Sequence, residues 1–208
     1  MKLQAAIDMK TIDEALKLME KIHPYVDIVE VGTFLGLLEG FSALTKMKAA
    51  YPHKDVLSDA KIVDGGYGIG GAAFDAGADI VTTIGLTNDE TLRGLVRAAH
   101  ERNKKAMVDT IGVPNIRERV VQLDEMGFDY ILLHTAHDML VCDSAPTEDV
   151  KACKKLVKRA LIGISGGITV EQMPEIVACD PDWVVVGSAI NKSDDPLSVV
   201  KALRSYMP

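Results

Sequence analysis

Short runs of apolar and β-branched residues recur along the chain, about 20 to 27 residues apart. They are LQAAID, DIVEVG, VLSDAK, DIVTTIG, KAMVDT, DYILLH, LIGISG and WVVVGS. Each run is too short and too continuously apolar for an amphipathic surface helix. Each therefore predicts a strand of a parallel sheet that is covered on its outer face.

Segments with helical periodicity lie between these runs and begin at recognisable start signals. Three of the predicted strands also follow similar lead-ins, 77-GADIV, 127-GFDYI and 180-DPDWV, which is typical of repeated βα units. Eight strands alternating with eight helices predict one (β/α)8 barrel over residues 1–208, with a doubly wound open sheet as the alternative. The predicted helix starts are Thr11 with Glu14, Asn88, Pro114, and Thr169 with Gln172.

Composition narrows the possible partners. The 208 residues are 48% hydrophobic and carry a formal net charge of -7, which offers no basic face to nucleic acid or to acidic lipid. The chain has no apolar run of membrane-spanning length and no signal peptide, so we expect no membrane partner. Cys142, Cys153 and Cys179 show no CxxC spacing and are expected to be free thiols in a cytoplasmic protein.

Polar residues collect where the predicted strands end. In a (β/α)8 barrel these ends meet at the face that carries the catalytic groups. Carboxylates and a histidine therefore recur at equivalent positions of successive βα units. The residues at these positions are Asp8, Glu30, Asp59 with Lys61, Asp109, His134, Ser165-Gly166-Gly167, and Gly187-Ser188.

The third strand carries the most informative pattern, 57-LSDAKIVDGG-66. Asp59 and Lys61 are two residues apart and share the lumen face, while Ala60 and Ile62 suit packing against helices. Neighbouring carboxylates favour the ammonium form, so Lys61 is interpreted as a fixed cation or proton donor and not as a Schiff-base nucleophile. Glu30 and Asp59, from adjacent strands, are candidate ligands for a hard divalent cation such as Mg²⁺.

Two glycine-rich loops, ISGGIT (164–169) and VVGSAI (185–190), follow the seventh and eighth strands, where this fold usually binds phosphate. A phosphate clamp, a divalent metal, a cation among carboxylates and a histidine together suit an enediolate reaction. That class includes aldol cleavage, decarboxylation and proton exchange next to a carbonyl. The residues alone do not name the substrate.

The motif DAKIVDGG, with IVEVGT before it and HTAHD, ISGGI and VVGSAI after it, resembles the orotidine-5′-phosphate decarboxylase suprafamily. The likeness extends over nearly the whole chain. It is greatest to the branch that holds 3-hexulose-6-phosphate synthase and 3-keto-L-gulonate-6-phosphate decarboxylase.

The resemblance implies a Mg²⁺-dependent barrel that forms a homodimer with active sites at the subunit interface, acting on a phosphorylated ketose. By that analogy Glu30 and Asp59 bind the metal, and Lys61 together with Asp64 from the partner subunit holds the substrate hydroxyls and the enediolate. Asp8, Asp109 and His134 complete the pocket, with His134 carrying the proton. Gly167, Gly187 and Ser188 take the phosphate.

The segment after the sixth strand separates the branches. Decarboxylases of this family read His-Arg-x-Arg-Asp there, whereas this chain reads His134-Thr135-Ala136-His137-Asp138, similar to the synthases. The resemblance therefore favours addition of formaldehyde to D-ribulose 5-phosphate, and its reverse. Two alternatives stay open: a sugar-acid-phosphate decarboxylase in which His137 replaces an arginine, and a non-catalytic phosphate-binding barrel, which the departure from the family at 139–146 would allow.

Overall fold

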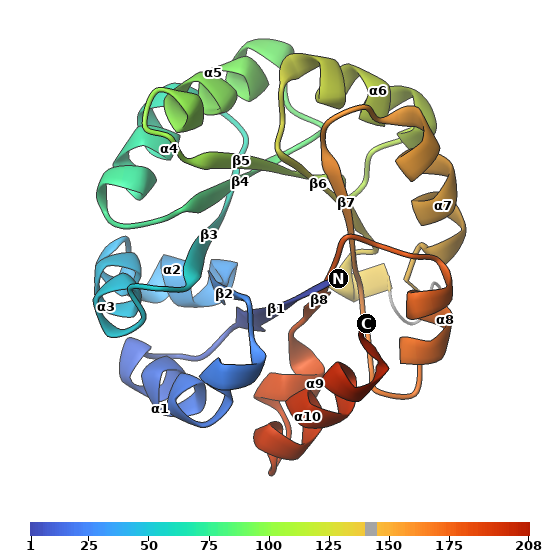
Figure 1. Cartoon of the computed structure of the whole chain (residues 1–208). Helices are drawn as coiled ribbons and strands as arrows, with labels where there is room; N and C mark the ends of the chain where they lie inside the picture. Colours follow the sequence, from blue (N-terminus) through green and yellow to red (C-terminus); the bar gives the residue numbers. More distant parts are fainter. Residues whose placement is uncertain (140–144) are drawn as a thin grey trace.

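Eight parallel strands close into a barrel in a computed structural model, which describes residues 1–139 and 145–208 (Figure 1). Each strand pairs with the next, and β1 pairs with β8, so the sheet has no free edge. This confirms the predicted (β/α)8 barrel and all eight predicted strands. The strands are β1 (Lys2–Ile7), β2 (Ile28–Val31), β3 (Asp55–Ile62), β4 (Ile80–Ile84), β5 (Lys105–Asp109), β6 (Tyr130–His134), β7 (Leu161–Ser165) and β8 (Trp183–Val186).

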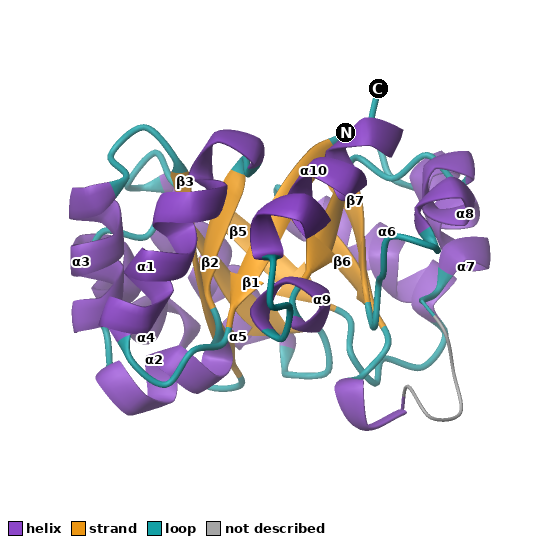
Figure 2. Cartoon of the chain, turned by 90° about the horizontal axis from the view of Figure 1, so that it is seen from below, coloured by secondary structure: helices purple, strands orange, loops and turns teal. Residues whose placement is uncertain are grey.

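Helices surround the barrel on its outer side, and the described residues contain ten α-helices where eight were predicted (Figures 1 and 2). The two additional helices, α2 and α9, directly follow β2 and β8. Gly40, at φ +64°, separates α2 from the helix that follows it. The helices are α1 (Ile12–Ile22), α2 (Thr33–Glu39), α3 (Ser42–Ala50), α4 (Gly66–Asp75), α5 (Asp89–His100), α6 (Ile116–Met126), α7 (Thr147–Leu156), α8 (Met173–Ala178), α9 (Ser188–Asn191) and α10 (Pro196–Tyr206), with 3₁₀ turns at His23–Tyr25 and His137–Met139.

Two of the four predicted helix starts are confirmed. Thr11 and Asn88 each accept a main-chain N–H of the first helical turn, at 3.2 and 2.9 Å. The other two predictions were wrong. Helix α6 begins after Asn115, two residues beyond Pro114, because Asn115 adopts a left-handed conformation that interrupts the helical path.

The fourth start lies at Met173 and not at Thr169. The main-chain N–H of Thr169 donates to the Gln172 side chain, as half of a capping box would, but the chain is not helical there. Pro174 lies in the first turn of α8, where its missing N–H leaves no carbonyl unpaired.

The core has two layers. Most buried side chains lie between the barrel wall and the helices, and a smaller group fills the lumen. Trp183 fills the lumen beside β7, where a Cβ on Gly163 would lie 2.1 Å from its ring. The lumen group is Ala6, Ile28, Leu57, Ile80, Met107, Tyr130, Leu132, Trp183 and Val185.

An aspartate placed immediately before a strand recurs around the amino-terminal end of the barrel. Its carboxylate accepts the main-chain N–H of a residue on the neighbouring strand at 2.7 to 3.0 Å. This contact accounts for the three similar lead-ins in the sequence, because Asp79, Asp129 and Asp182 each make the same bond. The donor and acceptor pairs are Leu3 with Asp27, Val56 with Asp79, Ala106 with Asp129, and Ile162 with Asp182.

Asp124 has a related role at the end of α6, and its removal gives a stability prediction. Its buried carboxylate accepts three main-chain N–H groups, from Lys158, Arg159 and Ala160, at 2.7 to 3.0 Å. We expect Asp124→Ala to lower the free energy of unfolding by about 2–4 kcal/mol, because these donors lose a charged acceptor. Urea unfolding measures the loss, and Asp75→Ala, at an exposed site, is the control that should behave like the parent protein.

The pH dependence of that loss tests the cause. Burial alone would raise the pKa of Asp124, but the three N–H groups outweigh it and hold the pKa below its ordinary value. The stabilisation is therefore complete above the unfolded pKa of about 3.9 and disappears as the pH falls toward the folded pKa. If the difference in the free energy of unfolding between Asp124→Ala and the parent protein stayed constant down to pH 3, this account would be contradicted.

Cys153 and Cys179 are buried free cysteines, and Cys142 lies outside the described residues. Burial raises the pKa of the Cys153 thiol to about 11, which keeps it protonated and unreactive at neutral pH. No helix in the described part of the chain combines the length and the apolar character needed to span a bilayer.

Candidate active site

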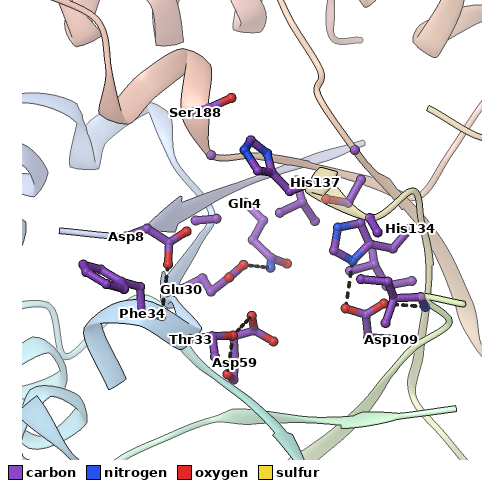
Figure 3. A pocket seen from close by; sticks show the side chains of 18 of the residues that line it. Gln4, Asp8, Glu30, Thr33, Phe34, Asp59, Asp109, His134, His137 and Ser188 are labelled. Carbon is purple, nitrogen blue, oxygen red and sulfur yellow. Dashed lines mark hydrogen bonds and ion pairs between the residues drawn. The ribbon is translucent and has the colours of Figure 1, made fainter. Parts of the chain in front are cut away.

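A cavity of about 710 Å³ opens at the carboxyl ends of the strands (Figure 3). The residues predicted from the sequence to form the site line it, with the single exception of Asp64. They come from seven different strands or from the loops directly after them. The fold therefore gathers into one cavity side chains that are up to about 180 positions apart in sequence.

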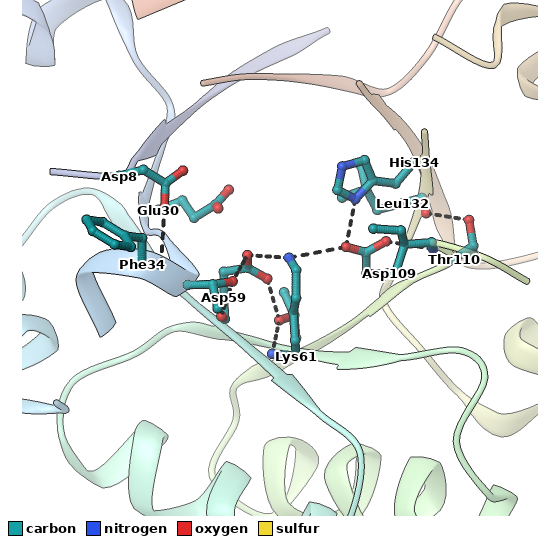
Figure 4. Close-up of polar contacts among 12 residues, drawn as sticks. Asp8, Glu30, Phe34, Asp59, Lys61, Asp109, Thr110, Leu132 and His134 are labelled. Atoms are coloured by element: carbon teal, nitrogen blue, oxygen red, sulfur yellow. Dashed lines mark hydrogen bonds and ion pairs between the residues drawn. The ribbon is translucent and has the colours of Figure 1, made fainter. Parts of the chain in front are cut away.

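Four charged or polar side chains form a continuous chain across the cavity floor (Figure 4). Lys61 Nζ lies 2.5 Å from Asp59 Oδ2 and 3.5 Å from Asp109 Oδ2. Asp109 Oδ2 is in turn 2.8 Å from His134 Nδ1. The row Asp59–Lys61–Asp109–His134 links strands β3, β5 and β6, and we refer to it as the polar row.

Lys61 is a cation in this setting. Burial alone would lower the pKa of its ammonium group, but the carboxylates of Asp59 and Asp109 outweigh burial and raise the pKa above its ordinary value. This direction agrees with the interpretation of Lys61 as a fixed cation, since a nucleophilic amine must first lose its proton.

Asp109 orients His134. Burial would raise the pKa of Asp109, but the hydrogen bond and charge of His134, together with Lys61, lower it, so the carboxylate is ionised. The ionised carboxylate accepts Nδ1–H, and the Ile111 main-chain N–H holds its other oxygen at 2.9 Å. The imidazole therefore keeps Nε2 for proton exchange with a ligand in the cavity.

Glu30 lies deep on the other side of the cavity, and no described lysine or arginine pairs with it directly. Gln4 Nε2 donates to Glu30 Oε2 at 2.5 Å, while the buried Gln4 Oε1 has no hydrogen-bond partner among the described residues. Burial, and then the charge of Asp59, raise the pKa of Glu30 to about 8. Two carboxylates that disfavour each other's charge in a buried site are suited to an added cation.

The donor set fits Mg²⁺. The described residues contain no group of three or more histidine, cysteine or acidic side chains arranged to hold a metal, so protein ligands would be few. Mg²⁺ is commonly bound by one or two carboxylates and keeps several waters, and the unpartnered Gln4 Oε1 offers an acceptor for one. Asp59 accepts from Lys61, Thr33 and Thr82, which leaves one of its about four acceptor positions free for a metal.

Asp8 adjoins this carboxylate pair at the end of β1. Its Oδ1 accepts the main-chain N–H of Phe34 at 3.4 Å. Burial raises the pKa of Asp8 although that hydrogen bond acts in the opposite direction. Only glycine fits at position 32, because a Cβ there would lie 2.2 Å from Asp8 Oδ1. Asp8 is thus held against the start of α2.

The glycine-rich loops border the cavity between His134 at the end of β6 and Asp8 after β1. Gly166 and Gly167 have φ of +122° and +64°, which side chains rarely adopt, and a Cβ on Gly166 would also lie 2.9 Å from Thr135. Gly187 and Ser188 follow β8 and begin α9, which Asn191 fastens to β1 through a 2.7 Å bond to the Ala6 carbonyl.

Among the lining residues that were not predicted, Gln4, Thr33 and Thr82 contact the carboxylates of the site. The strand alternation could have found two of them, since Gln4 precedes Asp8 by four positions and Thr82 follows Ile80 by two. Thr33 begins the unexpected helix α2, and only its place at the end of the IVEVGT motif marked it in the sequence.

Asp64 and His137 lie in different surroundings. Asp64 is exposed, lies beyond the end of β3 outside this chain's own cavity, and accepts the Gly65 N–H at 2.8 Å. His137, for which the sequence allowed either a surface or a site role, lines the cavity (Figure 3). The departing segment 139–146 falls mostly on residues 140–144, outside the described residues.

Comparison with known proteins agrees with this geometry. Residues 1–203 match the family described as Orotidine 5'-phosphate decarboxylase / HUMPS family. The 3-hexulose-6-phosphate synthase of Bacillus subtilis is 38% identical over 208 residues, which cover 100% of this chain and 99% of that protein. The crystal structure of 3-hexulose-6-phosphate synthase from Salmonella typhimurium is 40% identical, with a TM-score of 0.95 and coverage of 100% of this chain and 98% of the other.

The crystal structure of 3-keto-L-gulonate-6-phosphate decarboxylase from Vibrio cholerae has a TM-score of 0.85 over 99% of this chain and 96% of the other, but only 23% identity, so it supports the fold alone. The chain belongs to the orotidine 5′-phosphate decarboxylase / HUMPS family. It is an enzyme of the carbon–carbon lyase type, similar along its whole length to proteins named 3-hexulose-6-phosphate synthase.

Proposed function

We propose that this chain is a cytoplasmic, Mg²⁺-dependent 3-hexulose-6-phosphate synthase, which reversibly adds formaldehyde to D-ribulose 5-phosphate. The observation that carries the proposal is the polar row, in which a lysine between two aspartates and a histidine paired with one of them line the cavity. The similarity to synthases over the whole chain supports the same reaction.

In this proposal the ketose lies across the cavity. Its phosphate contacts the loops Ser165-Gly166-Gly167 and Gly187-Ser188, and its carbonyl end lies over the polar row, with Asp8 holding a hydroxyl. Mg²⁺, held by Glu30 and Asp59, would supply Lewis-acid stabilisation of negative charge next to the carbonyl. The phosphate contacts fix which carbon atom faces His134.

The proton then moves through His134. Its Nε2 removes a proton from C1 of the ketose, and the electron pair of that C–H bond forms the enediolate. C1 attacks the formaldehyde carbon, a C–C bond forms, and His134 returns the proton to the former formaldehyde oxygen. The Lys61 ammonium stabilises the negative charge on the substrate oxygens throughout, while Asp109 keeps His134 in the reactive tautomer.

A paired assay tests the proposal. One reaction contains D-ribulose 5-phosphate with formaldehyde and Mg²⁺, and the other contains 3-keto-L-gulonate 6-phosphate with Mg²⁺. We expect kcat/KM for formaldehyde consumption to exceed kcat/KM for CO₂ release. A larger value for CO₂ release would contradict the proposal and assign the chain to the decarboxylases.

That decarboxylase is the second candidate because His137 lines the cavity. His137 occupies the position of the second arginine in the decarboxylases' His-Arg-x-Arg-Asp segment. An imidazolium there could donate a proton to the carbanion left by CO₂. His137→Ala distinguishes the two candidates, since it should abolish CO₂ release but leave formaldehyde addition largely intact.

A homodimer with shared active sites forms part of the proposal. Exposed apolar side chains gather on α2, on the start of α4 and on the loops beside them, at the cavity end of the barrel. A soluble monomer rarely exposes so many large apolar side chains together. Asp64 lies in the same region and would reach the partner's cavity. The apolar side chains are Phe34, Leu37, Leu38, Phe41, Val63, Tyr67, Ile69 and Leu86.

We expect Leu38→Glu to convert the dimer to a monomer, because a buried charge at an apolar interface is costly. Leu38 is 56% exposed and does not line the cavity, so its replacement leaves the chain's own pocket unchanged. Tyr206→Glu is the control, because exposed Tyr206 ends α10 and the C-terminus that follows lies at the opposite end of the barrel (Figure 2). Sedimentation velocity gives the oligomeric state, and a Leu38→Glu protein that remains dimeric would refute this interface.

A further inference from the structure

Strand β3 is irregular at the point where it carries Asp59 and Lys61. Ser58 pairs with Val81 and Ile62 pairs with Thr83, so three residues of β3 lie opposite the single residue Thr82 of β4. Such a bulge removes ladder hydrogen bonds and redirects side chains, and bulges are frequent beside active sites. The main-chain N–H groups inside the bulge need other acceptors.

Lys61 has φ of +43°, a left-handed conformation that is uncommon and unfavourable for a residue with a long side chain. Its main-chain N–H donates to the Thr82 hydroxyl at 3.0 Å. The same hydroxyl donates to Asp59 Oδ1 at 2.9 Å. Thr82 therefore contacts two members of the polar row, one through its main chain and one through its carboxylate, and it is buried with 2% of its surface exposed.

We infer that Thr82 is a positioning residue for the reaction, an inference that rests on the roles proposed for Lys61 and Asp59. Its hydroxyl replaces the missing ladder bond and holds Lys61 in the left-handed conformation. That conformation directs the ammonium to the space between Asp59 and Asp109. The donated hydrogen bond also fixes the rotation of the Asp59 carboxylate, which would help to hold the metal.

Thr83 provides a matched comparison within the same strand. It too is fully buried, and its hydroxyl donates to β3, to the Ile62 carbonyl at 2.7 Å. However, its side chain lies on the outer face of the barrel and contacts no member of the polar row. Thr82 and Thr83 thus share residue type, burial and strand, and they differ in whether the hydroxyl contacts the polar row.

The test compares Thr82→Val, Thr82→Ser and Thr83→Val under the synthase assay. We expect Thr82→Val to lower kcat/KM by about 10- to 100-fold, a typical effect of losing an outer-shell hydrogen bond. The decrease in kcat/KM should come from a lower kcat. The KM for D-ribulose 5-phosphate should stay close to that of the parent, because the phosphate contacts are unchanged. Thr82→Ser keeps the hydroxyl and should restore most of the activity.

Thr83→Val should lower the free energy of unfolding about as much as Thr82→Val does, while its kcat stays near that of the parent protein. If Thr82→Val does not fold, Thr82→Cys, of similar size and a weak hydrogen-bonding group, takes its place. Equal kcat values for Thr82→Val and Thr83→Val would overturn the inference. Parent-level activity in Lys61→Ala would instead overturn the proposed function, so the two failures can be told apart.

Discussion

Replacing Lys61 with alanine is expected to abolish turnover while leaving the fold and the oligomeric state of the parent protein unchanged. The Lys61 ammonium is the cation of the polar row, 2.5 Å from Asp59 and 3.5 Å from Asp109. Without it, the negative charge that develops on the substrate oxygens meets two carboxylates and no fixed positive group. Loss of one such electrostatic contact typically costs about 10²- to 10³-fold in kcat, and we expect at least that loss.

Lys61→Met isolates the charge from the bulk of the side chain. It retains most of the aliphatic length but removes the ammonium group, so it should be as inactive as Lys61→Ala. Lys105→Ala is the matched control, because Lys105 also extends from a barrel strand and pairs with an aspartate, Asp129, but at the amino-terminal end. Circular dichroism and sedimentation establish folding and assembly. An active Lys61→Met protein would show that the cation is dispensable.

The second large effect is expected from the metal. Thorough chelation should abolish activity, and added Mg²⁺ should restore it, because Glu30 and Asp59 are the proposed ligands. Glu30→Gln should be as inactive as the chelated parent protein even in excess Mg²⁺, since a neutral amide is a weaker ligand than a carboxylate. Full activity after thorough chelation would refute the assignment of both residues.

The pH dependence of Mg²⁺ binding follows from the pKa of Glu30, which burial and then Asp59 raise to about 8. Below that pH the metal-free Glu30 holds a proton, which the cation must displace. The apparent Mg²⁺ affinity should therefore fall as the pH drops from about 8 toward 6, by up to about tenfold per pH unit. Isothermal titration calorimetry in buffers of different ionisation enthalpy measures both the affinity and the released proton.

The same pKa predicts the stability of Glu30→Gln without metal. A raised carboxyl pKa means that folding disfavours the charged form, so ionisation of Glu30 destabilises the metal-free parent protein as the pH rises above its unfolded pKa of about 4.3. The glutamine carries no such penalty. We expect Glu30→Gln to be at least as stable as the metal-free parent at pH 8, and a marked destabilisation would indicate a structural role for the Glu30 carboxylate.

The sequence by itself determined the barrel and most of its site. The eight apolar runs and their regular spacing are local patterns that recur along the chain, and each run forms one strand of the barrel. Side chains alternate along a strand, and the strand ends meet at one face of the barrel. For this reason the sequence pattern was sufficient to assign Glu30, Asp59, Lys61, Asp109 and His134 to one cavity.

Only the tertiary structure decided how those side chains are held. The left-handed Lys61, the Thr82 hydroxyl that supports it and the Gln4 contact to Glu30 each depend on register between strands that are distant in sequence. The starts of α6 and α8 likewise followed the path of the loops and not the local capping signals. The alternation of residues along each strand specifies which side chains reach the lumen. Their conformations are set by contacts between neighbouring strands, which form only when the barrel closes.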